Sequence, residues 1–319
     1  MTSLKKNFIY NVVYQMLLII LPLITAPYIA RTLGAEGVGI YSYTYSVAQY
    51  FLLFAMLGIS NHGNRSIAAV REDDCKLSRT FWSIYSIQAF MYVLAIIAYL
   101  IYLFAFNVDN KTIVAIQFIY VVSGALDISW YFFGTEQFKI TVTRNMIIKI
   151  ATVILMFIFV HNPGDLAKYT VIMAGGTFLS QAYLWTYIFR QVDVVKVNWI
   201  DIKKHIKEVI ILFIPVIAYS IYKLMDKIML GNMTTYMQVG YYENAGKIIN
   251  IPMGIITALG TVMLPRMSNM IAKGEMRKSV EYIRISIKLV TVIGSAIAFG
   301  LIGISNVLVP VYFGYEYMP

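Results

Sequence analysis

Nine long apolar runs, spaced along almost the whole chain, constrain what this sequence can fold into. They cover residues 8–30, 38–60, 81–105, 113–133, 144–160, 170–189, 209–230, 241–264 and 287–310. A helix of about 20 apolar residues crosses the roughly 30 Å hydrocarbon core of a bilayer. Hydrophobic residues make up 59% of the chain and charged residues only 13%, a composition that a water-soluble domain could not bury. The pattern therefore predicts an all-α polytopic membrane protein.

The net charge of +10 follows the expected membrane topology. The N-terminus and the loops after the second, fourth, sixth and eighth runs hold most of the Lys and Arg residues, whereas the other loops contain only Arg31, Lys111 and Lys168. Because basic loops stay in the cytoplasm, this alternation predicts a cytoplasmic N-terminus. It also argues against a nucleic-acid partner, which would need one basic surface. The single cysteine, Cys75, allows no intrachain disulfide.

Short matches at a nearly constant offset predict an internal repeat, a common feature of transporters. The segment 38–41 (VGIY) returns as 239–242 (VGYY), and Leu57-Gly58 returns as Leu259-Gly260. Six runs separate the copies, so both halves would cross the membrane in the same direction. We therefore expect a two-lobed transporter fold, with a six-helix N-terminal lobe over 1–192, a cytoplasmic linker over 193–208, and an incomplete C-terminal lobe of about three helices over 209–319. A half lobe also suggests a truncated product.

Polar side chains inside the apolar runs are candidates for a substrate-binding cavity, because ionisable groups in a membrane span are costly and mark function. In run 38–60 the spacing i, i+3, i+4, i+7 places four of them on one helix face: Ser42, Tyr45, Ser46 and Gln49. At the repeat offset, run 241–264 carries Glu243, Lys247 and Asn250, with Tyr242 beside them. Run 209–230 adds Tyr222, Lys223 and Asp226. These faces predict a water-filled cavity; snorkelling to the membrane interface is the alternative.

Three further polar residues are candidates: Arg31 at the end of run 8–30, Asp127 in run 113–133 and Lys149 in run 144–160. For Arg31 and Lys149 the alternative is again an anchor at the membrane interface. The three histidines are expected in loops and lack metal-ligand spacing. Because the sequence has no nucleotide-binding or nucleophile motif, we expect no metal, no cofactor and no enzymatic activity, ATP hydrolysis included.

Five segments, in order, resemble the polysaccharide repeat-unit flippases of the Wzx type: 27–39 (PYIARTLGAEGVG), 127–138 (DISWYFFGTEQF), 226–231 (DKIMLG), 240–245 (GYYENA) and 264–267 (LPRM). The resemblance implies the multidrug/oligosaccharidyl-lipid/polysaccharide exporter fold, in the bacterial cytoplasmic membrane. It also implies movement of an undecaprenyl-pyrophosphate-linked oligosaccharide to the outer leaflet by alternating access, for O-antigen or capsule. The implied partners are this lipid-linked oligosaccharide, membrane lipids, and the polysaccharide polymerase and chain-length machinery.

On this hypothesis Lys223 and Lys247 would bind phosphate, and Tyr45, Tyr222 and Tyr242 would stack on sugar rings. Asp226 and Glu243 would either couple transport to an ion or neutralise the lysines. Three alternatives stay open at this point. They are a cation-coupled multidrug exporter of the same superfamily, a membrane-embedded glycosyltransferase or polymerase, and an inactive truncated fragment.

Overall fold

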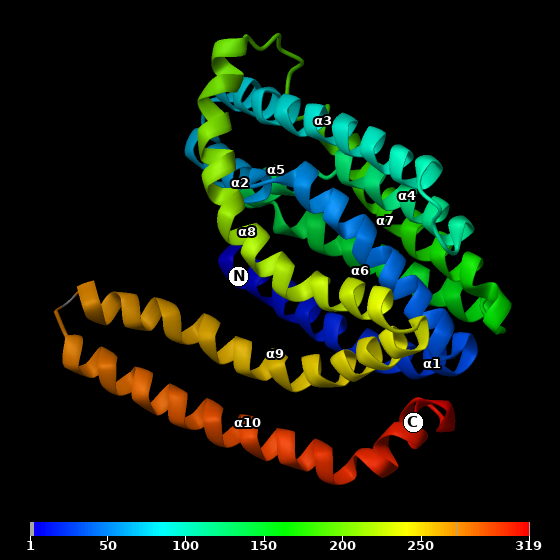
Figure 1. Cartoon of the computed structure of the whole chain (residues 1–319). Coiled ribbons are helices and arrows are strands. Elements are labelled where there is room, and N and C mark those ends of the chain that lie inside the picture. Colours follow the sequence, from blue (N-terminus) through cyan, green and yellow to red (C-terminus); the bar gives the residue numbers. More distant parts are fainter. Residues whose placement is uncertain (1–2, 273, 319) are drawn as a thin grey trace.

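The structure, a computed structural model, describes residues 3–272 and 274–318 (Figure 1). Its α-helices are α1 (Ser3–Met56), α2 (Ile59–Val70), α3 (Asp74–Ala105), α4 (Lys111–Ala125), α5 (Ser129–Gly134), α6 (Phe138–Phe159), α7 (Leu166–Ile188), α8 (Trp199–Met233), α9 (Tyr236–Ala272) and α10 (Met276–Tyr312). Two short 3-10 helices, η1 (Pro163–Asp165) and η2 (Tyr315–Tyr317), complete the elements. No strand occurs among these described residues, so the predicted all-α class is confirmed.

Five of the nine predicted membrane spans correspond to helices that are long and apolar enough to cross a bilayer. Within the described part of the chain, these are α3, the α4–α5 pair, α6 and α10, with the bent helix α8 as a fifth. The spans predicted at 8–30 and 38–60 lie mostly in α1, and those at 170–189 and 241–264 lie mainly in α7 and α9. These four do not pass the same test of length and hydropathy, so they stay predictions.

A kink at Gly34 divides α1 into two arms, where the sequence predicts the turn between the first two spans. Gly34 has φ 70° and ψ 173°, a conformation that glycine adopts without steric cost. The carboxylate of Glu316 accepts a hydrogen bond from the Ala35 backbone N–H at 3.0 Å. A Cβ at position 34 would lie 2.9 Å from the same carboxylate. Glycine therefore permits both the kink and the close approach of Glu316.

The predicted span 113–133 is broken at Asp127, and Gln88 of α3 stabilises the break. The Gln88 amide donates to the Asp127 carbonyl at 2.9 Å and accepts from the Trp130 indole at 2.9 Å. It also donates to the carbonyls of Gly124 and Ala125, both at 3.3 Å. Carbonyls at a helix end need such partners, since the next turn does not supply them. Beyond the break, the buried Trp130 belongs to the core cluster that α5 forms with α2 and α3.

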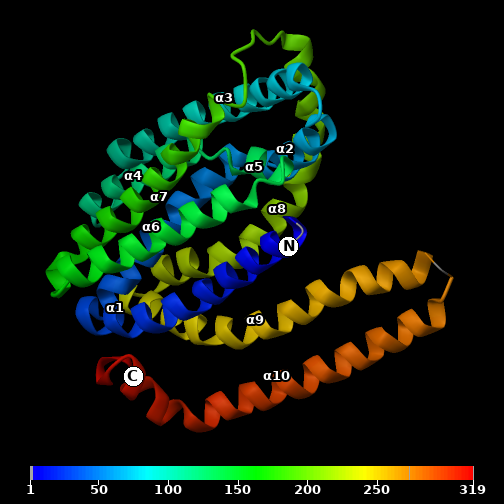
Figure 2. The same ribbon diagram turned by 180° about the vertical axis from the view of Figure 1, so that it is seen from behind.

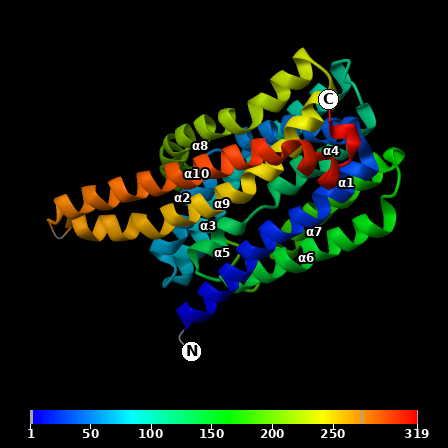
Figure 3. The same ribbon diagram turned by 90° about the horizontal axis from the view of Figure 1, so that it is seen from below.

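The helices form a bundle around the second arm of α1, from which α9 and α10 extend (Figures 1 and 2). Helices α3, α4, α6 and α7 all pack against α1, and α9 crosses its second arm at Gly39. Helix α10 runs back along α9 (Figure 3). The most apolar stretch of α10 contains no buried residue. Residues 199–208, which the sequence places in a linker, are the first turns of α8. The bundle therefore surrounds the polar face predicted on α1.

Candidate functional site

A cavity of about 370 Å³ lies where α1, α4, α6, α7 and α9 meet, and we call it the charged cavity. Its lining residues are Ile29, Val38, Tyr41, Tyr45, Tyr120, Lys149, Tyr169, Met173, Thr177, Glu243 and Lys247. Four of the residues predicted from the sequence are among them: Tyr45, Lys149, Glu243 and Lys247. Polar groups from helices far apart in the sequence thus converge inside an apolar bundle.

A second cavity, of about 380 Å³, adjoins the charged cavity and reaches α8. Tyr45, Tyr120 and Thr177 line both cavities. Two more predicted residues, Gln49 and Asp127, line the second one. The two spaces therefore share a wall, and together they place a polar path along the inner faces of α1, α4 and α7.

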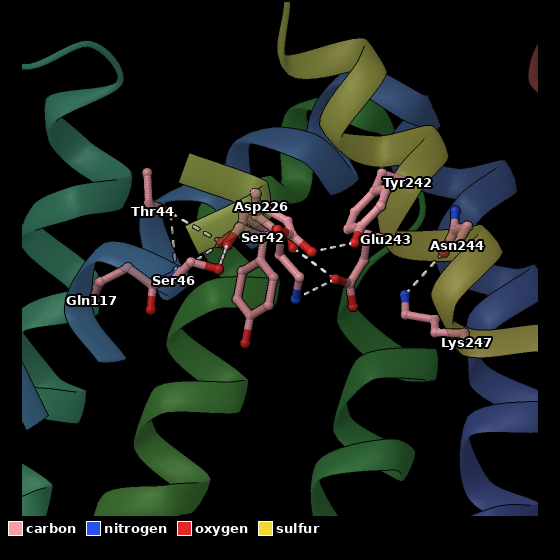
Figure 4. A network of polar contacts seen from close by, with 11 residues as sticks. Ser42, Thr44, Ser46, Gln117, Asp226, Tyr242, Glu243, Asn244 and Lys247 are labelled. Carbon is pink, nitrogen blue, oxygen red and sulfur yellow. Dashed lines mark hydrogen bonds and ion pairs between the residues drawn. The ribbon is translucent and has the colours of Figure 1, made fainter. Parts of the chain in front are cut away.

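Glu243 of α9 is held at the edge of the charged cavity by two partners (Figure 4). Its carboxylate lies 2.6 Å from the Lys227 ammonium of α8 and accepts a hydrogen bond from the Ser42 hydroxyl of α1 at 2.8 Å. The side chains of Lys227 and Glu243 are only 20% and 21% exposed. A charge withdrawn from water this far needs a partner of opposite sign. Glu243 is thereby fixed, and its carboxylate interacts electrostatically with both Lys227 and Lys247.

Lys247 lies one turn beyond Glu243 on α9, and its ammonium reaches the same cavity. It donates a hydrogen bond to the side-chain oxygen of Asn244 at 3.0 Å. That partner is neutral and itself buried, so it positions the ammonium without removing its charge. Lys149 of α6 lines the opposite part of the cavity. The cavity therefore holds two lysines in addition to the Lys227–Glu243 ion pair.

Tyrosine rings make up much of the remaining wall. Tyr41 stacks on Tyr45 with ring centroids 5.8 Å apart, and its hydroxyl lies 3.0 Å from that of Tyr120. Tyr169 of α7 meets Tyr41 edge to face at 4.8 Å. Such rings offer apolar faces together with polar hydroxyls, a combination that suits sugar rings. Sequence reasoning missed Tyr41, Tyr120 and Tyr169; only Tyr41, one turn before Tyr45, carried a usable signal.

Other predicted residues lie away from the lining of these two cavities. Ser42 and Ser46 are buried in α1, where the Ser46 hydroxyl donates to the Ser42 carbonyl at 2.8 Å. The Lys223 ammonium lies 5.0 Å from the centre of the Tyr219 ring, on the exposed side of α8. Asp226 accepts a hydrogen bond from the Tyr242 hydroxyl at 2.7 Å.

Three predicted residues remain to be placed. The guanidinium of Arg31 donates to the Val311 carbonyl, so it joins α1 to α10. Asn250 is exposed on α9. The side chain of Tyr222 lies outside the part of the chain that the structure describes.

Two histidines expected in loops lie in helices, so that expectation is wrong. His62 belongs to α2 and His205 to α8, and their ring nitrogens Nε2 and Nδ1 are 2.8 Å apart. The Glu208 carboxylate lies 3.1 Å from His62 Nδ1. Helix α2 has a low mean hydropathy, which is why its sequence resembles a loop. Within the described residues, no group of three or more His, Cys, Asp or Glu side chains is arranged to hold a metal ion.

The helices and the internal charged cavity together define a polytopic membrane protein with a polar interior. A family model described as polysaccharide biosynthesis protein matches residues 4–271. The chain therefore belongs to this family, and the family resemblance drawn from the sequence is confirmed.

Two curated relatives cover nearly the whole chain. A protein of Escherichia coli (strain K12) named "Putative O-antigen transporter" is 27% identical, over 99% of this chain and 77% of its own length. A Shigella dysenteriae protein of the same name is 23% identical, over 98% of this chain and 79% of its own length. No solved structure matches the chain.

Proposed function

We propose that this protein is a flippase that moves an undecaprenyl-pyrophosphate-linked oligosaccharide from the inner to the outer leaflet of the bacterial cytoplasmic membrane. The observation that carries the proposal is the charged cavity, where Lys149 and Lys247 face a wall of tyrosines. The names of the two relatives support export of O-antigen material, and the family match supports a role in polysaccharide biosynthesis. The protein would act as a transporter rather than as an enzyme.

The charges of the cavity suit a diphosphate. Lys227 and Glu243 form an ion pair, so their charges cancel and leave those of Lys149 and Lys247. A diphosphate that links a lipid to a sugar carries one negative charge on each phosphate at neutral pH. Each lysine would then neutralise one phosphate by a charge-assisted hydrogen bond, worth about 1.5–3 kcal/mol. Lys223, the other phosphate candidate, faces outside the two cavities and would contribute only after a conformational change.

The headgroup needs such a cavity because hydrocarbon excludes it. Charged phosphates and sugar hydroxyls lose their hydration in hydrocarbon at a large cost, whereas the polyprenyl tail can stay in the bilayer. A polar path that accepts the head from one side and releases it to the other removes this cost. We propose that the N-terminal part, residues 1–192, and the part from residue 209 onward rock against each other. The cavity would then open alternately to each leaflet.

The proposed function implies an orientation of the chain in the membrane and an order in which its partners handle the substrate. The N-terminus would be cytoplasmic, since basic residues gather at that end of the helices. The lipid-linked oligosaccharide would arrive from cytoplasmic assembly, and the polysaccharide polymerase with its chain-length machinery would use it on the outer side. An epitope inserted at 163–164, in the short 3-10 helix η1 before α7, should be labelled from outside intact cells.

Genetic complementation tests the function. The chromosomal copy is deleted, the protein or a variant is supplied in trans, and surface polysaccharide is measured together with lipid-linked repeat units retained inside. We expect restored polymer with the unchanged protein and an accumulated intermediate with Lys247→Gln or Lys149→Gln. Lys288→Gln is the matched control, because it removes an exposed lysine of α10 that lines neither cavity. If neither polymer nor trapped intermediate responds to the deletion, the flippase proposal is wrong.

A further inference from the structure

A groove between α6 and α7, with a volume of about 490 Å³, is separate from the two cavities described above. Helices α6 and α7 lie side by side in Figure 2. The groove is open on the outside of the bundle, because Ile147 and Tyr183 in its lining are 61% and 45% exposed. No described residue of the charged cavity belongs to it. The groove would therefore face lipid rather than the transport path.

The two ends of the groove differ in polarity. Lys139, in the first turn of α6, and Tyr187, at the end of α7, form one end. Ile147 and Ile148 form the other end, eight and nine residues farther along α6. At 1.5 Å per residue, the apolar end lies about 12 Å deeper along the helix axis. Because Lys139 is at the predicted cytoplasmic end of its span, the polar end would lie at headgroup level and the apolar end among the acyl chains.

The polar end carries positive charge. Lys139 is exposed, whereas the guanidinium of the buried Arg144 donates to the Ser180 carbonyl at 2.9 Å, to the Gln181 side chain at 3.2 Å, and to the Asn145 side chain at 2.8 and 3.2 Å. These hydrogen bonds hold the Arg144 guanidinium within the contact between α6 and α7, so Lys139 is the basic group that the groove exposes. No carboxylate is among the described residues that line the groove.

Two phenol hydroxyls complete the polar end. The hydroxyls of Tyr183 and Tyr187 lie 2.9 Å apart and are exposed to the groove. Only one of them can donate to the other, so the second keeps a proton for an outside acceptor. A phosphate oxygen is such an acceptor. The polar end thus offers an ammonium and a phenol donor within one groove.

We propose that this groove is a binding site for an anionic glycerophospholipid of the cytoplasmic leaflet. Its phosphate would lie against Lys139 and the tyrosine pair, and one acyl chain would run along Ile147 and Ile148. A zwitterionic lipid fits less well, because its ammonium would face Lys139. Free phosphate would leave the apolar end empty. The site is independent of the flippase proposal, since it shares no lining residue with the charged cavity.

Native mass spectrometry of the purified protein tests the site. Dioleoylphosphatidylglycerol, dioleoylphosphatidylcholine and inorganic phosphate are titrated separately into detergent-solubilised protein, and the fraction with one bound ligand is measured. We expect saturable binding of phosphatidylglycerol that exceeds binding of phosphatidylcholine. Lys139→Ala should weaken phosphatidylglycerol binding about fivefold, the change expected for one basic group at an anionic lipid surface. Tyr183→Phe, which removes a hydroxyl but keeps the ring, should weaken it as well.

The matched control is Lys203→Ala, which removes an exposed lysine from the first turns of α8, outside the groove. It should leave phosphatidylglycerol binding unchanged. Thr143→Trp places a bulky ring in the groove and should block binding while the protein still elutes as a single species in gel filtration. Equal binding of the two lipids would overturn the proposal, as would equal effects of Lys139→Ala and Lys203→Ala. Binding of inorganic phosphate that matches phosphatidylglycerol would overturn the choice of a lipid.

Discussion

The backbone of Gly39 in α1 lies directly against that of Gly240 in α9, and the two glycines are 201 residues apart. A Cβ at position 39 would lie 1.6 Å from the Tyr236 carbonyl oxygen, and a Cβ at position 240 would lie 1.9 Å from the Ala35 carbonyl oxygen. Tyr236 itself follows Ala35 by 201 residues. The glycine of each helix therefore faces the carbonyl of the equivalent residue on the other helix. A pseudo-twofold axis through this crossing would require such a reciprocal contact. This reciprocity supports the proposed repeat.

Gly39→Ala and Gly240→Ala should each push α1 and α9 apart, because each added methyl group meets a carbonyl rather than a movable side chain. Overpacking of this kind costs about 1–3 kcal/mol, and thermal unfolding of the purified protein would measure it. Gly246→Ala is the control in the same helix, since a Cβ there meets nothing within 4 Å. Equal melting temperatures for the Gly240→Ala and Gly246→Ala variants would contradict the close crossing.

Glu243→Gln should destabilise the protein more than the matching double change. The single variant leaves the Lys227 ammonium, only 20% exposed, without its carboxylate. Removing one partner of a buried ion pair costs about 3–5 kcal/mol, and residual solvent screening should reduce this to about 1–3 kcal/mol. Lys227→Gln/Glu243→Gln removes both charges and should recover more than half of the loss. A double-mutant cycle on melting temperature gives the coupling; zero coupling would show that the ion pair does not hold α8 against α9.

Gln88→Leu should weaken the broken α4–α5 segment. The substitution removes the donor that serves the carbonyls of Gly124 and Asp127 and the acceptor of the Trp130 indole. Each buried polar group left unpaired costs about 1–3 kcal/mol, so a loss of at least about 2 kcal/mol is expected in thermal unfolding. Gln137→Leu serves as control, because it breaks only a half-buried amide pair with Gln191. If both variants melt alike, Gln88 does not support the break.

The sequence predicted the helical class and part of the charged cavity for the same physical reason. Polar residues at helical spacing in an apolar run mark one helix face. When the repeat offset is added to the positions on the face of Tyr45, it indicates the region of Glu243 and Lys247. It could not predict Tyr120 or Tyr169, because the rotation of α4 and of α7 about their axes is set by packing against other helices. Lys149 could be selected only as a charge within a span.

Two features were read wrongly or incompletely for identifiable reasons. Helix α2 follows α1 after a break at Leu57 and Gly58 and contains few apolar residues, so His62 was expected in a loop. Its contact with His205 joins residues 143 positions apart, and no local pattern encodes such a distance. The break at Asp127 depends on Gln88, 39 residues earlier. Periodicity identifies helices, but long-range side-chain contacts decide where they break and meet.

Acidification should loosen the contact between α2 and α8 through His62 and His205. His62 Nε2 and His205 Nδ1 lie 2.8 Å apart, so one nitrogen must donate a hydrogen bond and the other must accept it. Both nitrogens therefore cannot carry a proton while this contact is kept. Burial lowers the pKa of His62 more than the neighbouring Glu208 carboxylate raises it, and Arg65 lowers it further. Lys204 and Asp201 are the other charges near His205. A lowered histidine pKa means that the stabilisation is complete above about pH 6.5 and decreases as the pH falls.

Thermal unfolding between pH 8 and pH 5.5 measures this effect. The unchanged protein should lose more stability over this range than His62→Gln, which cannot be protonated and can keep a hydrogen bond. His161→Gln removes the exposed histidine before η1. This variant should retain the full pH dependence, because His161 takes no part in the contact between His62 and His205. Spin labels at the exposed residues Asn64 of α2 and Lys203 of α8, in a Cys75→Ser background, would report the separation of α2 and α8 directly. A distance that stays constant from pH 8 to pH 5.5 would contradict the expected opening.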